Sequence, residues 1–484
     1  MMQRLLTKYG LVLHTALIVL YPVLFIAQQR VFDLVALLWL SLVALELMVL
    51  LPSVRKGETL SDARRRVLRA LVFDPLLYIG LSIVGVALIQ WGNSGCALVY
   101  LPDADVWQFS NPSVAWAPFS VEARAAGAYV SVFSACVVTG LVLRVAVSKG
   151  SKRLLIQGLS LVSGGAALYL VLHACQGIEP FAARALDQGA TPMGTFFGFW
   201  LLLGIGAFVD ALARCQRGAL SLFLFGVVGN LLGMLFFASA LVLLVYGVIA
   251  ILLFIYAIIY LEPHVAKHVQ FKLFLGALAT FAGVALVLIF VFPGNPVVLK
   301  IKAAFPLAAY WDARCVIKAV RTAAALGIWQ EHPWIGVGAD GFYHFAGLAV
   351  AGKDWGLMKA DPASVYNDAL QFLCEFGVLG AGLLLSAIVT LLVPICYRAR
   401  LAWERGTHDE NEGRFFLLRI SPIVLAGVLA VLVCFFESWI ANPFQSVSLL
   451  LSWTCVMAIL PSFLPPHRGK NEKRPPSQTN DTVN

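Results

Sequence analysis

The chain has 484 residues, of which 60% are hydrophobic and 13% are charged, and its mean hydropathy is +0.85. So much apolar surface cannot be hidden in the core of a water-soluble domain, and the composition therefore predicts an integral membrane protein. The net charge of +9 is interpreted as membrane orientation, because the sequence has no basic and aromatic surface module of the kind that binds nucleic acid.

An apolar stretch of about 18 or more residues with few charges is long enough to cross a bilayer. The chain has about twelve such stretches, which predicts an all-α, polytopic membrane helix bundle with one long loop between spans 9 and 10. The predicted spans are 9–27, 32–51, 71–91, 126–147, 154–174, 193–212, 219–238, 241–261, 273–293, 377–397, 418–437 and 446–464.

Lys and Arg are retained on the cytoplasmic side of short loops, so their distribution orients the predicted bundle. Twelve crossings with both termini inside place 24 of the 35 Lys and Arg in cytoplasmic segments. These segments are 1–8, 52–70, 148–153, 213–218, 262–272, 398–419 and 465–484. The predicted parts of the chain are spans 1–9 (1–293), an extracytoplasmic loop (294–376), spans 10–12 (377–464) and a disordered cytoplasmic tail (465–484).

Seven further basic residues fall in the long loop 294–376. Long loops are translocated largely regardless of charge, so these residues leave the predicted topology unchanged. An anionic partner is the simplest reason for them. Arg314, Lys318 and Arg321 recur at i, i+4 and i+7, which places them on one face of a helix. The alternative is that they face anionic lipid headgroups or solvent.

The passage WQEHPWIGVGADGF, residues 329–342, predicts a series of tight turns because it combines Pro333 with several glycines. Glycine has no side chain, so Gly336 and Gly338 could let a ligand approach the backbone closely. The alternative is an interfacial loop anchored by its tryptophans, which is common in membrane proteins.

The passage DPASVYNDALQFLCEFGVLG, residues 361–380, predicts the start of a long helix. Asp361 and Pro362 suit the N-cap and first positions, and no breaker follows before Pro394. Such a helix would be roughly 50 Å long, whereas a bilayer core needs only about 30 Å. Its first turns would therefore stand outside the membrane, with one face formed by Asn367, Gln371 and Glu375.

These two passages resemble the O-antigen ligase and polymerase family of polysaccharide glycosyltransferases. The first is similar to that family's HP-x-x-GVG-x-x-F passage. The second, in which Asn367 is followed by nine residues, Gly377, two residues and Gly380, is similar to its His-Asn-(nine residues)-Gly-x-x-Gly signature. The resemblance implies transfer of a glycan from a polyprenyl diphosphate carrier to an acceptor hydroxyl on the outer face of the bacterial inner membrane, with no cofactor and no metal.

Such a site needs cations facing the diphosphate and a base or hydrogen-bond acceptor near the attacking hydroxyl. The cations on the predicted helix face, Arg314, Lys318 and Arg321, are the candidates for diphosphate binding. The residues expected in the chemistry are Tyr366, Asn367, Asp368 and His332. Further substrate contacts are expected from Gly336, Gly338, Gln371 and Glu437. Glu437 is included because a carboxylate at the end of an apolar span is costly unless it is paired or wetted; a position at headgroup level is the alternative.

Two positions depart from the family pattern. Tyr366 stands where the family has His, and Ser239-Ala240 stands where many members have a Ser-Arg pair. Tyrosine is a poor base near neutral pH unless a nearby cation lowers its pKa. Asp368, Asp361, His332 or His344 could serve instead.

Two alternatives to catalysis follow. One is a degenerate family member that binds lipid-linked glycan as an assembly subunit. The other is a transporter or flippase for a polysaccharide precursor. In every case the expected partners are a polyprenyl-diphosphate-linked glycan, a glycan or lipid acceptor, and membrane lipids, without nucleic acid.

The topology predicts that residue 353 is reached from outside the cell and residue 409 is not. We expect a membrane-impermeant thiol reagent to label a cysteine introduced at 353 in intact cells, and to label one at 409 only after permeabilisation. All nine native cysteines are first replaced. Labelling of position 409 but not of 353 in intact cells would reverse the orientation.

Overall fold

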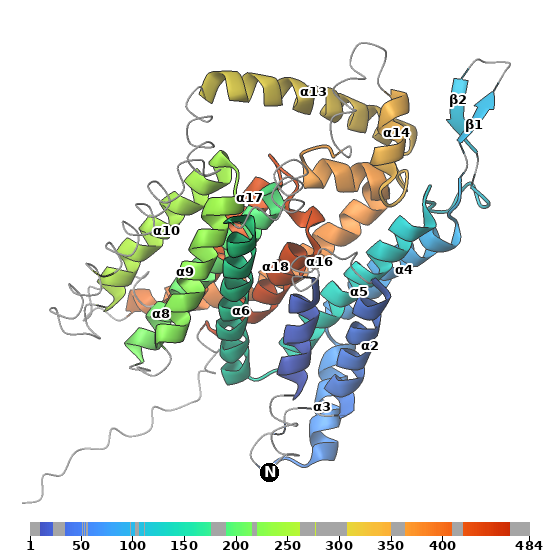
Figure 1. Ribbon diagram of the computed structural model, residues 1–484. Helices are drawn as coiled ribbons and strands as arrows, with labels where there is room; N and C mark the ends of the chain where they lie inside the picture. Colours follow the sequence, from blue (N-terminus) through green and yellow to red (C-terminus); the bar gives the residue numbers. More distant parts are fainter. Residues whose placement is uncertain are drawn as a thin grey trace, which may run out of the picture.

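The computed structural model describes residues 10–22, 34–50, 52, 54, 57–96, 98–101, 106–110, 112–175, 190–214, 220–261, 276, 307–349, 364–408 and 420–464. Of these described residues 82% are helical, and seven of the described helices are long and apolar enough to cross a membrane. The helices run alongside one another as a bundle (Figure 1). The prediction of a helical membrane protein is thereby confirmed in its coarse form.

An apolar helix over Gly10–Pro22 precedes the labelled elements. The helices are α2 (Leu34–Leu50), α3 (Leu60–Val72), α4 (Pro75–Gly92), α5 (Ala123–Val145), α6 (Lys149–Cys175), α8 (Ala190–Ala213), α9 (Leu220–Phe237), α10 (Ala240–Leu261), α13 (Leu307–Glu331), α14 (Gly341–Ala349), α16 (Asp368–His408), α17 (Pro422–Glu437) and α18 (Val447–Ile459), with short 3-10 turns η4 (Pro443–Gln445) and η5 (Leu460–Ser462).

Helix is present in eleven of the twelve predicted spans. The remaining one, 273–293, lies outside the described residues apart from Gly276. Four of the helices in predicted spans have only 10–17 residues. The bundle is therefore shown, whereas the number of crossings stays a prediction.

Helix α8 is the most deeply buried of the long apolar helices, with 83% of its apolar window inside the protein. It packs against α6, α9, α10 and α17. Its Trp200 is buried, and the indole Nε1 donates to Ser452 Oγ of α18 at 3.1 Å. A buried indole N–H needs such a partner, because an unpaired polar group in an apolar interior is costly.

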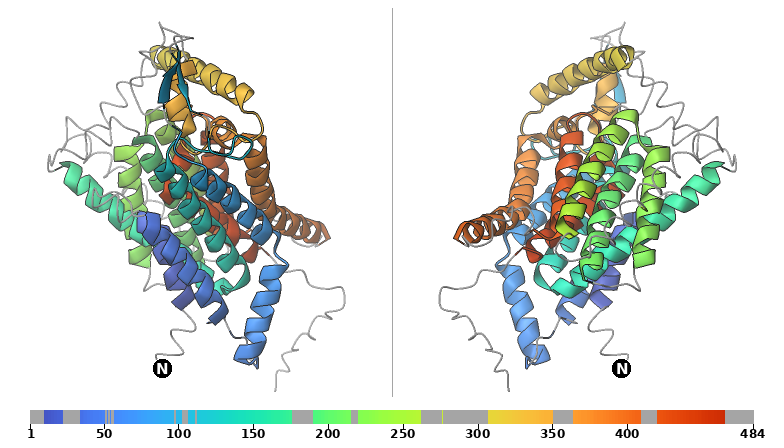
Figure 2. Two further views of the ribbon diagram at one scale, coloured as in Figure 1. Left: turned by 90° about the vertical axis from the view of Figure 1, so that its right-hand side faces the viewer. Right: turned by 90° about the vertical axis from the view of Figure 1, so that its left-hand side faces the viewer.

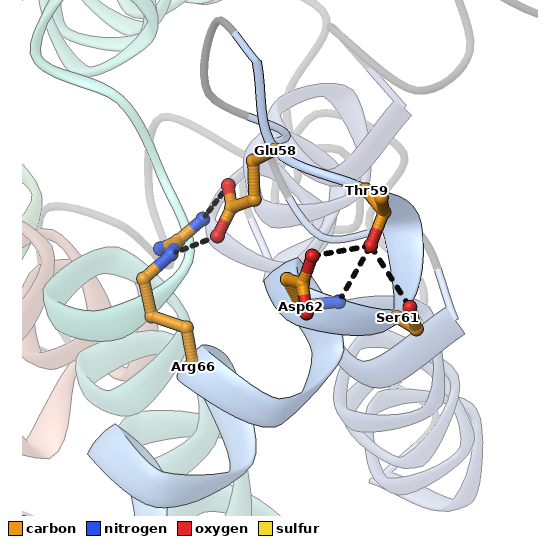
Figure 3. A network of polar contacts seen from close by, with 5 residues as sticks. All are labelled: Glu58, Thr59, Ser61, Asp62 and Arg66. Carbon is orange, nitrogen blue, oxygen red and sulfur yellow. Dashed lines mark hydrogen bonds and ion pairs between the residues drawn. The ribbon is translucent and has the colours of Figure 1, made fainter.

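Two smaller features lie outside the long helices. A two-stranded antiparallel sheet, β1 (Leu98–Leu101) with β2 (Val106–Phe109), was not predicted and projects from the connection between α4 and α5 (Figure 1). Helix α3 lies at the opposite end of the bundle from α13 and α14 (Figure 2). It is capped by Thr59, which accepts from the Asp62 N–H at 3.2 Å (Figure 3).

Helix α16 corrects the prediction of one unbroken helix from Asp361. Asp361 itself lies outside the described residues, but the chain is not helical at 364–367 and Tyr366 has a φ of 55°. The helix begins at Asp368, and Asn367 is its cap, since Asn367 Oδ1 accepts from the Leu370 N–H at 3.1 Å. It is then interrupted at Gly377, where φ is 64° and ψ is −171°.

The interruption at Gly377 is filled by the glycine-rich loop of residues 333–338. Val337 and Gly338 donate their N–H groups to the carbonyls of Cys374 and Glu375 at 3.0 and 2.8 Å. On the other side of the break, the N–H groups of Val378 and Leu379 donate to the carbonyls of Pro333 and Trp334 at 2.9 and 3.2 Å. We call this set of four backbone hydrogen bonds the interlock.

Only glycine fits at the centre of the interlock. A β-carbon on Gly377 would lie 2.4 Å from the carbonyl carbon of Trp334, and one on Gly336 would lie 2.4 Å from that of Glu375. Both residues also have positive φ, which strains any residue that carries a β-carbon. The two passages that carry the family resemblance therefore meet as one packed unit.

The interlock predicts a position-specific cost for alanine in α16. Gly377→Ala should lower the free energy of unfolding by at least about 1–2 kcal/mol, the cost of a left-handed residue, with the backbone clash in addition. The measurement is thermal unfolding in detergent. Gly382→Ala is the matched control, because a β-carbon there meets nothing within 4 Å, and it should be neutral. Similar stability of the two variants would contradict the interlock.

Candidate functional site

The first turn of α16 is held against the turn that follows α17. The Asp368 N–H donates to the Ser438 carbonyl at 2.9 Å, and Asp368 Oδ2 accepts from the Phe444 N–H at 3.0 Å. Asp368 is therefore fixed by backbone groups on both sides. Since Asn367 caps the helix, this signature residue and the adjoining Asp368 are both placed by the helix start itself.

Arg321 and Tyr366, predicted from separate patterns, are brought together. Arg321 of α13 is only 1% exposed, and its Nη1 donates to the Ser364 carbonyl at 2.9 Å. Its guanidinium carbon lies 4.8 Å from the centroid of the Tyr366 ring, a cation–π contact. The structure thus places a cation beside the tyrosine that stands at the family's histidine position.

The other two cations of α13 differ in their placement. Lys318 is one helical turn from Arg321 and more exposed, and its Nζ donates to the Trp439 carbonyl at 2.7 Å. The predicted helix around these cations is confirmed by α13. Arg314 belongs to that helix, but its side chain lies outside the described part of the structure.

Glu437, at the end of α17, is buried beside this turn with an exposed fraction of 9%. Its Oε1 accepts from the hydroxyl of Thr195 of α8. Its Oε2 is buried and has no hydrogen-bond partner among the described residues. Glu437 also interacts electrostatically with Asp368 and with the buried Tyr246 of α10. Two carboxylates therefore lie near each other at this end of the bundle, and one of them has a buried oxygen without a hydrogen-bond partner among the described residues.

Gln371 and Glu375 form a buried network on the next turns of α16. Gln371 Nε2 donates to Glu375 Oε1 at 3.0 Å, and Gln371 Oε1 accepts from Gln445 Nε2 at 3.0 Å. The other Glu375 oxygen lies 3.4 Å from the Tyr129 hydroxyl of α5, and the Asp340 N–H also bonds the Glu375 carboxylate. The amide of Gln371 is thus bonded to protein at both ends, although a substrate contact was predicted for it.

His332, Gly336 and Gly338 lie in a different part of this end of the bundle. The His332 ring packs edge-on against Phe119 and Phe345, with centroids 5.7 and 6.3 Å apart. The close approach predicted at Gly336 and Gly338 is made by the chain's own backbone, because a β-carbon at Gly338 would lie 2.0 Å from the Phe119 carbonyl oxygen. A packing reason therefore exists for these glycines without a ligand.

A small acidic group lies at the start of α14. Burial raises the pKa of the Asp340 carboxyl, Glu122 adds to this effect, and His344 opposes it. His344 Nε2 lies 3.9 Å from Glu122 Oε2. His344, one of the substitute bases considered above, thus has a carboxylate partner within reach.

Sequence reasoning missed Thr195, Tyr246 and Tyr129. Thr195 and Tyr246 are polar residues inside apolar spans, and this was the only local signal, because their partners are far away in the chain. Within the described residues, no group of three or more His, Cys, Asp or Glu side chains is placed to hold a metal ion.

Comparison with known proteins assigns no family to the chain. No family model matches the chain, and no curated protein matches it. The resemblance to the O-antigen ligase and polymerase family therefore rests on the two sequence passages and the predicted topology.

The network around Glu375 predicts which substitutions of this residue the protein tolerates. Glu375→Gln keeps an acceptor and should lower the melting temperature little. Glu375→Leu leaves Gln371, Tyr129 and the Asp340 N–H unpaired, at about 1–3 kcal/mol for each buried group, and should unfold at a clearly lower temperature in detergent. Glu331→Leu, at the exposed end of α13, is the control. Equal melting temperatures for all three variants would show that the network adds no stability.

Proposed function

We propose that this chain is a glycosyltransferase that moves a glycan from a polyprenyl diphosphate carrier to an acceptor hydroxyl, as in the O-antigen ligase and polymerase family that it resembles. One observation carries the proposal. Tyr366 and Asn367, at the signature's first two positions, and the adjoining Asp368 lie together with a buried arginine and with a buried carboxylate, one of whose oxygens has no hydrogen-bond partner among the described residues.

The proposed chemistry needs a proton acceptor for the attacking hydroxyl. A carboxylate with an open oxygen can accept that proton, provided the oxygen lies within hydrogen-bond reach of the acceptor. Glu437 has an oxygen without a hydrogen-bond partner among the described residues, and Asp368 adjoins the signature and is its electrostatic neighbour. We assign the role of proton acceptor to this carboxylate pair. In this assignment Tyr366 only fills the space that the histidine occupies in the family.

The diphosphate leaving group needs cations. Lys318 is the more exposed of the two described candidates, and its partner is a neutral carbonyl, so its charge is not cancelled. Arg321, bonded to Ser364 and stacked on Tyr366, sits one turn deeper. In this proposal Lys318 meets the diphosphate first, and Arg321 fixes the loop that carries the signature.

The proposed setting is the bacterial inner membrane, with twelve spans, both termini in the cytoplasm and the loop 294–376 outside. Contacts between distant segments support this arrangement. Predicted outer residues meet at one end, as Lys318 does with Trp439 and Gln90 with Glu375. Predicted inner residues meet at the other, as Arg153 does with Asp210, next to the segment 213–218.

A second candidate is a binding or assembly role without turnover. The replacement of the family's histidine by Tyr366, and of its arginine by Ala240, favours this reading. The purified protein, reconstituted in lipid nanodiscs with undecaprenyl-diphosphate-linked glycan and an acceptor glycolipid, separates the two. Release of undecaprenyl diphosphate with glycan on the acceptor supports transfer, whereas binding of the donor without product supports the assembly role.

Three near-isosteric variants test the assignment of roles. Asp368→Asn and Glu437→Gln keep the acceptors used by Phe444 and Thr195 but lose basicity, so the fold should persist. We expect at least one of them to lower the turnover rate about 10²–10⁴-fold. Tyr366→Phe keeps the ring beneath Arg321 and should retain activity. Loss of activity in Tyr366→Phe alone would transfer the role to the tyrosine hydroxyl.

A further inference from the structure

Four cationic side chains from two helices contact η5 and Phe463, which follow α18, at the end of the bundle opposite to the candidate site. They come from the start of α6 and from the last third of α16, and the sequence analysis predicts that both segments are cytoplasmic. We call them the basic cluster: Lys149, Lys152, Arg153 and Arg398.

The partners of the basic cluster are mostly neutral. Lys152 Nζ donates to Ser462 Oγ at 2.7 Å, and Arg398 Nη1 donates to the Pro461 carbonyl. The Lys149 ammonium and the Arg153 guanidinium lie 5.9 and 5.4 Å from the centroid of the Phe463 ring. A hydroxyl, a carbonyl and an aromatic face attract cations but carry no full negative charge.

One described carboxylate, that of Asp210, forms ion pairs in this region, and two arginines share it. Asp210 Oδ2 lies 3.0 Å from Arg153 Nε and 3.2 Å from Arg214 Nε. Among the described residues, the cluster therefore retains an excess of positive charge.

The excess positive charge is energetically most costly at Lys152. It is only 4% exposed, and the charged groups that act on it are Arg398 and Arg144, both cations. Arg144 is already paired with Asp74 at 2.9 Å. A buried ammonium among like charges is unfavourable unless an anion neutralises it. This is the arrangement of a site that receives its anion from outside the chain.

The surface beside the cluster indicates which anion. Helix α16 exposes an apolar row at four-residue spacing that ends next to Arg398, formed by Leu385, Val389, Val393 and Tyr397. In a membrane such a row faces acyl chains. A phospholipid lying along it would bring its headgroup phosphate to Arg398, whose planar fork can hold two phosphate oxygens.

We propose that the basic cluster binds the headgroup phosphate of an anionic phospholipid, with an acyl chain along the exposed row of α16. The site is independent of the candidate active site and of the proposed transfer reaction. The bound phosphate supplies a negative counter-charge for Lys152 and Arg398, whose hydrogen-bond partners in the described structure are neutral.

The test uses thermal unfolding of the whole protein in a neutral detergent, with phosphatidylglycerol, phosphatidylcholine or sodium phosphate added at matched ionic strength. Phosphatidylglycerol should raise the melting temperature of the wild type by several degrees, because a ligand that binds only the folded state stabilises it. Phosphatidylcholine and inorganic phosphate should have much less effect. Native mass spectrometry should show phosphatidylglycerol retained.

The double variant Lys152→Met/Arg398→Gln should lose most of this shift. In neutral detergent alone it should melt at the same temperature as the wild type or higher, since it removes mutual repulsion. The control, Arg65→Gln/Arg69→Gln, removes two charges from exposed positions on α3 and should keep the full shift. A double variant that melts lower without lipid, or that keeps the phosphatidylglycerol shift, would overturn the proposal. Inorganic phosphate as effective as phosphatidylglycerol would overturn the lipid assignment.

Discussion

The break in α16 at Gly377 is the constraint on which the end of the bundle with the candidate site depends. An interrupted helix leaves carbonyl and N–H groups without partners, and in an apolar medium each such group costs on the order of several kcal/mol. The loop 333–338 supplies those partners through four backbone hydrogen bonds. A stretch of irregular loop and a stretch of membrane helix are thus each incomplete without the other. This dependence explains why the two passages are glycine-rich at matching places.

The interlock also sets the direction of the short helical segment before the break. That segment carries Asp368, Gln371 and Glu375. Asp368 and Gln371 both contact the turn at 438–445, whereas Glu375 contacts Tyr129 of α5. A single backbone irregularity therefore determines where three polar side chains meet the rest of the bundle. Glu437, whose Oε2 has no hydrogen-bond partner among the described residues, is not held by the interlock. It is positioned by α17 and by Thr195.

The features that could be predicted from the sequence are those that depend on local periodicity. Long apolar runs gave the positions of most helices, and the spacing of Arg314, Lys318 and Arg321 gave α13. The start of α16 could not be predicted in this way. Asp361-Pro362 is a sound local signal for a helix start, but the helix begins only after the turn at Tyr366, which has a positive φ. Arg321 of the distant helix α13 holds that turn through the Ser364 carbonyl. The contacts of Glu437 with Thr195 and of Glu375 with Gln90 join residues 242 and 285 positions apart, beyond any pattern within one segment.

The long separation of these contacts has a consequence for biosynthesis. A membrane protein is inserted helix by helix from its N-terminus, and the partners Ser438 and Phe444 of Asp368 leave the ribosome after both signature passages. Until α17 and the following turn are in place, Asp368 lacks the two backbone groups that fix it, and Glu437 is not yet made. A chain arrested after α16 would carry every residue of both passages and still lack the assembled candidate site. Assembly of that site therefore waits for α17 and the turn that follows it.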